Sequence, residues 1–263
     1  MTGPAGMLAL VLAEGAAGGA AILFLTPLWN EVRRRFFLLT GGVVFVLALA
    51  AAVTARAGTL SSFLMDEAIV ALQLSLVLTL ATLVWLVLIA VRLSTAGRLV
   101  GIATVPLAVV TLVAFARTGA DSFAVSIFEL LAGAAFMGAV VDGLLLGHWY
   151  LTDRKLTRAP INRMAWILLA AVLLEAVAVI VGSLGGDSAT RPTALNPLLT
   201  IAGSSRWIAL GMVACTALIA VMIRLTLRGS RPTAVQSATG FFYLAVITAF
   251  TAELAAKVGF LPS

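Results

Sequence analysis

Five acidic residues lie inside long apolar stretches, and a lysine follows the last of them by four residues. These candidate site residues are Glu14, Glu129, Asp142, Glu175, Glu253 and Lys257. An ionised side chain is costly inside a membrane, so such residues usually face the interior of a helix bundle and belong to a functional site. Carboxyl groups there can pass protons, or hydrogen-bond a quinone, a cation or a polar substrate. We therefore expect these six residues to form a quinone-binding or proton-handling site.

The spacing within this set favours two local arrangements. Glu253 and Lys257 are four residues apart with the acid first, which is the favourable order for an ion pair on one helix face. The alternative is a structural pair at the membrane surface, with a lysine that extends toward the headgroups. Glu14 and Glu129 each precede a stretch of small residues, at 15–21 and 132–139. Such stretches let helices pack closely, and they also leave space beside a carboxylate.

His148, next to two aromatic residues, is the only histidine of the chain, and Cys215 is the only cysteine. His148 is interpreted either as a relay on the inner side of the membrane or as a structural group. No two potential ligands have the spacing of a metal site, and a single histidine cannot supply both axial ligands of a haem. The sequence therefore predicts neither a metal nor a haem bound by this chain.

The elements that must position these residues are membrane-spanning helices. Of the 263 residues, 62% are hydrophobic and 11% are charged, and the mean hydropathy is +1.14. A span needs about 20 apolar residues to cross ~30 Å of hydrocarbon as a helix. The sequence predicts an all-α, polytopic membrane helix bundle of about eight spans, forming a single transmembrane domain over 1–263. The expected spans are 7–29, 36–57, 67–91, 99–116, 123–149, 165–184, 207–224 and 236–258.

The basic residues predict the orientation of this bundle. The first set of alternate loops holds 12 of the 17 basic residues: Arg33, Arg34, Arg35, Arg92, Arg98, Arg154, Lys155, Arg158, Arg163, Arg224, Arg228 and Arg231. The second set holds five: Arg56, Arg117, Arg191, Arg206 and Lys257. The richer side is expected to face the cytoplasm, which places both termini outside and the protein in the inner (cytoplasmic) membrane. The net charge of +6 thus reflects topology and anionic headgroups, and no nucleic acid partner is expected.

Orientation gives each acid a depth in the bilayer. Glu14, Glu129 and Glu253 are expected at a similar level in the outer half of the membrane. Glu175 is expected near the middle of the membrane and Asp142 in its inner half. The sequence therefore predicts an outer group of carboxylates, with two deeper acids that extend a path inward.

Two segments of the sequence share the same order of residue types, which is typical of an internal repeat. Residues 14–35 and 131–155 each contain small residues, an apolar run, a tryptophan and then basic residues. The second segment begins four spans after the first, so the two would have the same orientation. This pattern predicts a 4+4 repeat, although small residues in spans also have packing reasons of their own.

The topology and the stretch LAEGAAGGAAILFL at 12–25, followed by a basic inner loop, resemble a known family. Eight spans with both termini outside are similar to the quinol-interacting membrane anchors of the polysulfide reductase and DMSO reductase type. The resemblance implies a subunit without its own haem or metal, which binds a quinone near the outer face. It also implies an iron–sulfur or cytochrome c subunit at that face.

Three functions follow from these observations. The first is a membrane subunit of a respiratory or other energy-converting redox complex, which handles quinone or protons with its carboxylates and is at most a quinone-site subunit of an oxidoreductase. The second is a stand-alone proton-coupled transporter for a small solute or ion, with Glu175 or Asp142 as the coupling residue. The third is a structural or assembly membrane protein whose acids satisfy one another.

Overall fold

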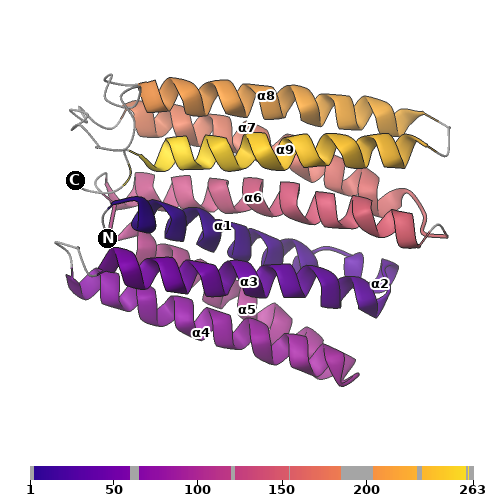
Figure 1. Ribbon diagram of the computed structural model, residues 1–263, viewed down its shortest axis with the longest axis horizontal. Helices are drawn as coiled ribbons and strands as arrows, with labels where there is room; N and C mark the ends of the chain where they lie inside the picture. Colours follow the sequence, from indigo (N-terminus) through magenta and orange to yellow (C-terminus); the bar gives the residue numbers. More distant parts are fainter. Residues whose placement is uncertain are drawn as a thin grey trace.

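The computed structural model describes residues 3–59, 65–119, 122–153, 155–184, 204–229, 233–258 and 260. Within these ranges the secondary structure is entirely helical, and eight helices are long and apolar enough to cross a membrane. This confirms the expected all-α, polytopic bundle, which is shown in Figure 1. The elements are α1 (Gly3–Leu25), α2 (Leu28–Glu31), α3 (Arg34–Thr59), α4 (Met65–Ala90), α5 (Ser94–Ala116), α6 (Phe123–Thr152), α7 (Ala159–Leu184), α8 (Ser204–Arg228) and α9 (Ala234–Lys257).

The first span differs from its expected range of 7–29. Helix α1 ends at Leu25, and a separate short helix, α2, begins at Leu28. Pro27 lies between them, where its ring disfavours helical backbone at the preceding residue and its nitrogen has no proton for a helix hydrogen bond. The apolar pattern continues through this break, so hydropathy alone could not locate it.

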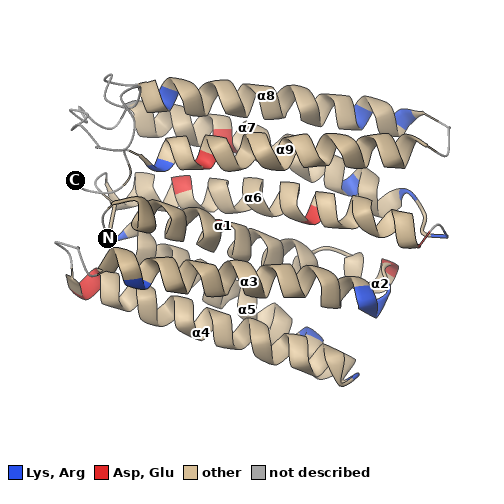
Figure 2. Ribbon diagram, viewed as in Figure 1, with Lys and Arg blue, Asp and Glu red and all other residues tan. Residues whose placement is uncertain are grey.

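The bundle has two chemically different ends. Both termini lie at one end in Figure 1, and Figure 2 shows lysine and arginine concentrated at the other. We call these the terminal end and the arginine-rich end, where Arg33, Arg34, Arg92, Arg98, Arg158, Arg163, Arg224 and Arg228 lie in or beside the helix ends. The loops that were expected to share the richer set of basic residues therefore do lie together at one end of the bundle. The assignment of the arginine-rich end to the cytoplasm stays a prediction.

The two halves of the chain form similar rings of four helices. In the first half, α1 packs against α3, α3 against α4, α4 against α5, and α5 returns to α1. In the second half, α6, α7, α8 and α9 repeat this order of neighbours. The rings meet where α1 contacts α6, and the contact of α1 with α9 has its counterpart in the contact of α6 with α5. This is the arrangement expected of a 4+4 repeat about an axis along the bundle.

Two contacts between the halves join residues that are 120 positions apart. Gly18 of α1 packs on Gly138 of α6, and a Cβ added at Gly138 would lie 2.3 Å from the carbonyl carbon of Gly18. Arg33 forms an ion pair of 3.1 Å with Asp153. On a two-fold axis a position meets its own equivalent, so both contacts mark such an axis. Trp29 and Trp149, from the two segments that suggested the repeat, are separated by the same 120 positions.

Ion pairs and caps hold the arginine-rich end together. The guanidinium of Arg163 donates to both oxygens of Glu31, at 2.7 and 2.9 Å, which ties α2 to α7. This hydrogen bonding holds the pKa of Glu31 below its ordinary value. Arg34 donates to the carbonyl oxygens of Ile89 and Ala90, at 2.7 and 3.0 Å, and so caps the end of α4 from α3.

The close crossing of α1 and α6 leads to a first prediction, on the stability of a Gly18 variant. A Cβ on Gly18 would lie 1.7 Å from the carbonyl oxygen of Ala134, so Gly18→Ala must force the two helices apart. We expect a loss of about 1–3 kcal/mol, the usual cost of overpacking a close contact. The measurement is thermal unfolding of the purified protein in detergent. Gly42→Ala in α3 is the matched control, because an added Cβ there meets no atom within 4 Å. Equal melting of the two variants would contradict this packing.

Candidate functional site

A buried ion pair joins the last helix to the first at the terminal end of the bundle. Lys257 is the final residue of α9 and is 2% exposed. Its Nζ lies 2.8 Å from Oε1 of Glu14 in α1 and 3.3 Å from Oε2 of Glu253, one turn earlier in α9. Both carboxylates are fully buried. The expected Glu253–Lys257 pair is present, and Glu14 is a closer partner than Glu253.

Gly133 of α6 makes room for these groups. A Cβ at this position would lie 2.6 Å from Oε1 of Glu14 and 2.9 Å from Oε2 of Glu253. Any larger residue would therefore occupy the space of the two carboxylates. The two roles considered for small residues are thus both present, because Gly18 lets the helices meet and Gly133 leaves space for the acids. Gly133 was not identified as a site residue from the sequence, although its stretch AGAA was recognised as small.

Two further acids complete the cluster from α6 and α7. Glu175 of α7 is 2% exposed, and its carboxyl group is a neighbour of Glu253. Glu129 of α6 is half-buried and interacts electrostatically with Glu175 and Lys257. Its carboxylate lies against α7, where a Cβ on Gly182 would be 1.7 Å from Oε1 of Glu129. We call Glu14, Glu129, Glu175, Glu253 and Lys257 the carboxyl–lysine cluster.

The cluster holds more acid than base. One ammonium group can neutralise one carboxylate, whereas three fully buried carboxyl groups, of Glu14, Glu175 and Glu253, lie beside it. An unpaired ionised carboxylate in a low-dielectric site is too costly to persist, so the remaining acids must be neutralised by protons or by a bound cation. Within the described ranges, no three histidine, cysteine or acidic side chains are arranged to hold a metal ion. Carboxyl groups that hold protons are one state that this composition allows.

Several oxygens of the cluster are available to further donors. Oε2 of Glu14, Oε1 of Glu253 and Oε2 of Glu175 are buried and have no hydrogen-bond partner among the described residues. Buried acceptors in proteins are normally satisfied, so an exception at a charged site indicates a proton, a water molecule or a ligand. Figure 2 shows acidic segments of α6, α7 and α9 gathered toward the terminal end.

The structure separates one of the six candidate acids and bases, Asp142, from the other five, and it also separates the candidate relay, His148, from them. Asp142 is fully buried but lies farther along α6, against α1 and α3, and outside the cluster. His148 is exposed and lies near the arginine-rich end of α6. Glu14, Glu129, Glu175, Glu253 and Lys257 are brought together. Thus Glu14, Glu129 and Glu253, which were expected at one level of the membrane, belong to one cluster. Glu175, which was expected nearer the middle of the membrane, belongs to it as well.

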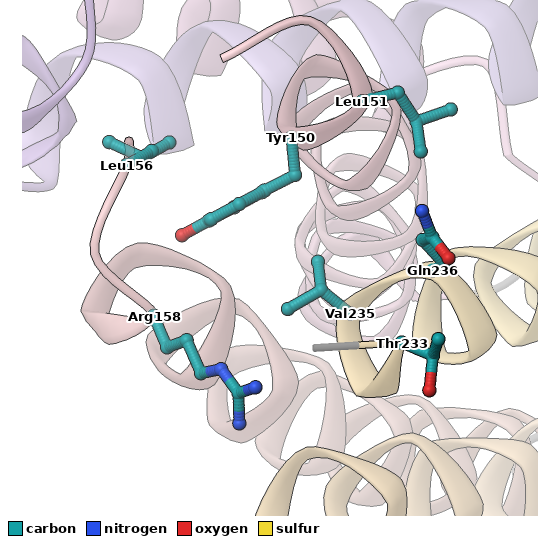
Figure 3. Close-up of a pocket in the computed structure, with 7 residues that line it drawn as sticks. All are labelled: Tyr150, Leu151, Leu156, Arg158, Thr233, Val235 and Gln236. Carbon is teal, nitrogen blue, oxygen red and sulfur yellow. The ribbon is translucent and has the colours of Figure 1, made fainter. Parts of the chain in front are cut away.

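A pocket of about 380 Å³ at the arginine-rich end is drawn in Figure 3. Its main polar groups are used by the fold. The hydroxyl of Tyr150 donates to the carbonyl of Thr157, and Arg158 donates to the carbonyl of Gly229 at 2.6 Å. These contacts fix the connection between α6 and α7 and the end of α8, so we regard the pocket as structural.

A second hollow is an apolar groove of about 310 Å³ between α1, α5, α6 and α7. Gly18, Ala134 and Val109 are among the residues that line it. On α6, a residue that lines the groove (Ala134) therefore directly follows the residue that adjoins the cluster (Gly133).

Comparison of the chain with protein-family models, with curated proteins and with solved structures finds no match to any of them. Fold and site together define an integral membrane helix bundle with three buried acids, Glu14, Glu175 and Glu253, beside one buried lysine.

The buried charge of Lys257 leads to a second prediction, on the stability of a variant that lacks it. Lys257→Met keeps the length of the side chain but removes its charge, and leaves Glu14 and Glu253 without a counter-charge. We expect a loss of about 3–5 kcal/mol, because breaking a buried pair strands its partner. The double variant Lys257→Met/Glu14→Gln should recover part of this loss, since one stranded carboxylate is removed. Thermal unfolding in detergent measures both effects.

Arg56→Met is the control for this experiment, because Arg56 is an exposed cation in the last turn of α3 at the terminal end. It should leave the unfolding temperature nearly unchanged. A Lys257→Met protein as stable as the Arg56→Met protein would show that the ion pair is not a structural element.

Proposed function

We propose that this membrane protein exchanges protons through its carboxyl–lysine cluster. The observation that carries the proposal is the ratio of three fully buried carboxyl groups, of Glu14, Glu175 and Glu253, to the one ammonium group of Lys257 beside them. Acids in such a site change charge only by gaining or losing protons, and each change is shared among neighbours that interact strongly. The cluster therefore has the composition of a proton store inside a membrane.

The residues have different parts in this proposal. Lys257 stays charged and stabilises one negative charge, which Glu14 and Glu253 share because both reach its ammonium group. Glu175 holds a proton that neutralises it, and Glu14 and Glu253 share one more proton between them. When one of these acids gives up its proton to an acceptor, a proton from a neighbouring carboxyl group or from water replaces it. The net charge of the cluster is then restored without any movement of a helix.

We further propose that the acceptor is a quinone and that the chain is the membrane subunit of a redox complex in the inner membrane. Reduction of a quinone consumes two protons with two electrons, so a quinone needs proton donors beside it, and the carboxyl groups of the cluster can serve as such donors. The apolar groove of about 310 Å³, which lies close to the cluster along α6, suits an apolar tail. The resemblance in topology to quinol-interacting anchors and the predicted outer location of the cluster support the same assignment. An iron–sulfur or cytochrome c partner would supply or remove the electrons.

A proton-coupled transporter is the second candidate, and the repeat of two four-helix rings favours it. The ion pair of Lys257 with Glu14 links α9 of one ring to α1 of the other, so a change in protonation acts at the junction of the rings. Inverted or parallel repeats with a polar site at their junction are common in transporters. In this case the cluster would couple proton binding to a movement of the rings.

The third prediction tests proton exchange directly. Glu14→Gln and Glu175→Gln should each remove part of the carboxyl C=O infrared absorbance that shifts when the protein in vesicles is transferred to D₂O. Only a carboxyl group that holds and exchanges a proton gives this signal. The matched control is Asp66→Asn, which neutralises an exposed acid in the first turn of α4 at the terminal end. If neither cluster variant changes the exchangeable absorbance beyond the control, the cluster does not exchange protons.

The fourth prediction separates the redox subunit from the transporter. Purification in mild detergent should recover the chain with a redox-active partner, and solvent extraction of the complex should yield a quinone. An Ala135→Leu variant, which adds bulk to the wall of the apolar groove, should retain less quinone than the wild-type protein. Recovery as a lone monomer or homodimer without quinone would exclude the subunit assignment and leave the transporter.

A further inference from the structure

Asp142 is a fully buried acid that the cluster does not use. It lies on α6 against Gly19 of α1, where an added Cβ would be 3.6 Å from Oδ1 of Asp142 and 2.9 Å from Cγ2 of Val44 in α3. Neither of its carboxyl oxygens has a hydrogen-bond partner among the described residues, and none of the ion pairs found there includes it. Packing alone gives no reason for an acid at this position.

Thr40 lies one helical turn from Val44 on the same face of α3, toward the arginine-rich end. It is fully buried, and its hydroxyl has no partner among the described residues. The other buried threonines of the described ranges behave differently, because each donates to a backbone carbonyl three or four residues earlier. They are Thr59, Thr79, Thr82, Thr104, Thr111, Thr118, Thr216 and Thr239. The free hydroxyl of Thr40 is thus an exception within its own residue type.

Trp149 ends the same seam between α3 and α6. Its ring packs on Phe36 with centroids 6.1 Å apart, and its buried Nε1 has no partner among the described residues. Phe36, Thr40 and Val44 follow one another by single turns, over about 12 Å of α3 at 1.5 Å per residue. Asp142 and Trp149 are seven residues apart, or about 10 Å of α6. The carboxyl, hydroxyl and indole N–H groups therefore follow one line from the middle of the bundle toward the arginine-rich end.

Three unpartnered polar groups on one line need a common partner. Each buried polar group without a hydrogen bond costs free energy, and water in polar interior sites commonly supplies the missing bonds. We propose that Asp142, Thr40 and Trp149 line a hydrated path that brings protons from the arginine-rich end to the carboxyl–lysine cluster. This inference rests on the proposed function of the cluster and adds to it the side from which the protons come.

The path continues from Asp142 to the cluster along α1. Gly19, which touches Asp142, lies five residues after Glu14, so the two acids differ in height by about 7.5 Å. Residues 15–19 between them are glycine or alanine, and Glu14 is the only acidic or basic residue of α1. In the proposed path, a chain of about two or three hydrogen-bonded water molecules would span this distance.

In one transfer, Asp142 releases one proton and takes up one proton. The carboxylic acid of Asp142 releases its proton to water on the cluster side, and a carboxylate of the cluster accepts a proton from that water chain. The carboxylate of Asp142 then takes a proton from water held by Thr40 on the other side. Asp142 returns to its initial state, and one proton has moved from the arginine-rich end to the cluster.

The fifth prediction begins with hydration, measured by thiol reactivity in the full chain. Cys215, the native cysteine, is first replaced by alanine. A cysteine placed by Thr40→Cys should then react with a water-borne thiosulfonate reagent at least ~10-fold faster than one placed by Thr239→Cys, since only a hydrated thiol ionises and reacts. Thr239 is the matched control because it is buried at a similar depth from the arginine-rich end and its hydroxyl donates to Val235. Equal reactivity would overturn the hydrated path.

The same prediction then tests proton delivery. Asp142→Asn should slow the H/D exchange of the cluster carboxyl band by ~10-fold or more, because an amide cannot release and regain a proton. Asp142→Glu should retain the exchange, and Thr40→Val should slow it while Thr40→Ser does not. Unchanged exchange in Asp142→Asn, with a reactive Thr40→Cys, would mean that water is present but that Asp142 does not carry protons, which also overturns the proposal. Failure of the cluster itself would appear separately, as exchangeable absorbance that is insensitive to Glu14→Gln.

Discussion

The ion pair between Lys257 and Glu14 is the interaction on which the terminal half of the bundle depends. It is formed where hydrocarbon cannot solvate a charge, so each partner requires the other. Because Lys257 belongs to α9 and Glu14 to α1, the same contact ties the two four-helix rings together. The two carboxylates lie so close to α6 that position 133 must be a glycine, because a Cβ there would overlap them. Glu175 of α7 is a neighbour of Glu253, so four helices, α1, α6, α7 and α9, meet at this site.

The site breaks the symmetry of the fold that contains it. With an offset of 120 positions, Glu14 corresponds to Ala134 and Asp142 corresponds to Ile22. The interface of α6 with α5, which is the counterpart of the cluster's interface between α1 and α9, is part of an apolar core that includes Leu112, Phe115 and Ala134. Packing is therefore satisfied without acids at one of two equivalent interfaces. Since the fold does not need the acids, their presence at the other interface is explained better by function than by structure.

The sequence predicts the elements of this protein better than their meeting points. Span number follows from the length of apolar runs, and the level of Glu14, Glu129 and Glu253 follows from direction and depth. Local spacing also predicts the Glu253–Lys257 pair. The contact of Lys257 with Glu14 could not be predicted, because hydropathy carries no information on which helices are neighbours. Thr40 looks like any other threonine of a span, and only its surroundings show that its hydroxyl is unpaired.

The stretch 15–19 shows why proton movement suits this bundle better than large movements of its helices. Gly15 faces Leu47 of α3, Gly18 touches α6, and Gly19 faces Val44 and Asp142, so three sides of one short segment are in close contact. Atoms this close leave no space for α1 to slide, and a rigid junction of the rings follows. A proton needs only short steps between fixed groups, whereas a larger solute needs the junction to open. The same glycines that fix the crossing keep Glu14 and Asp142 along one helix, within reach of a few water molecules.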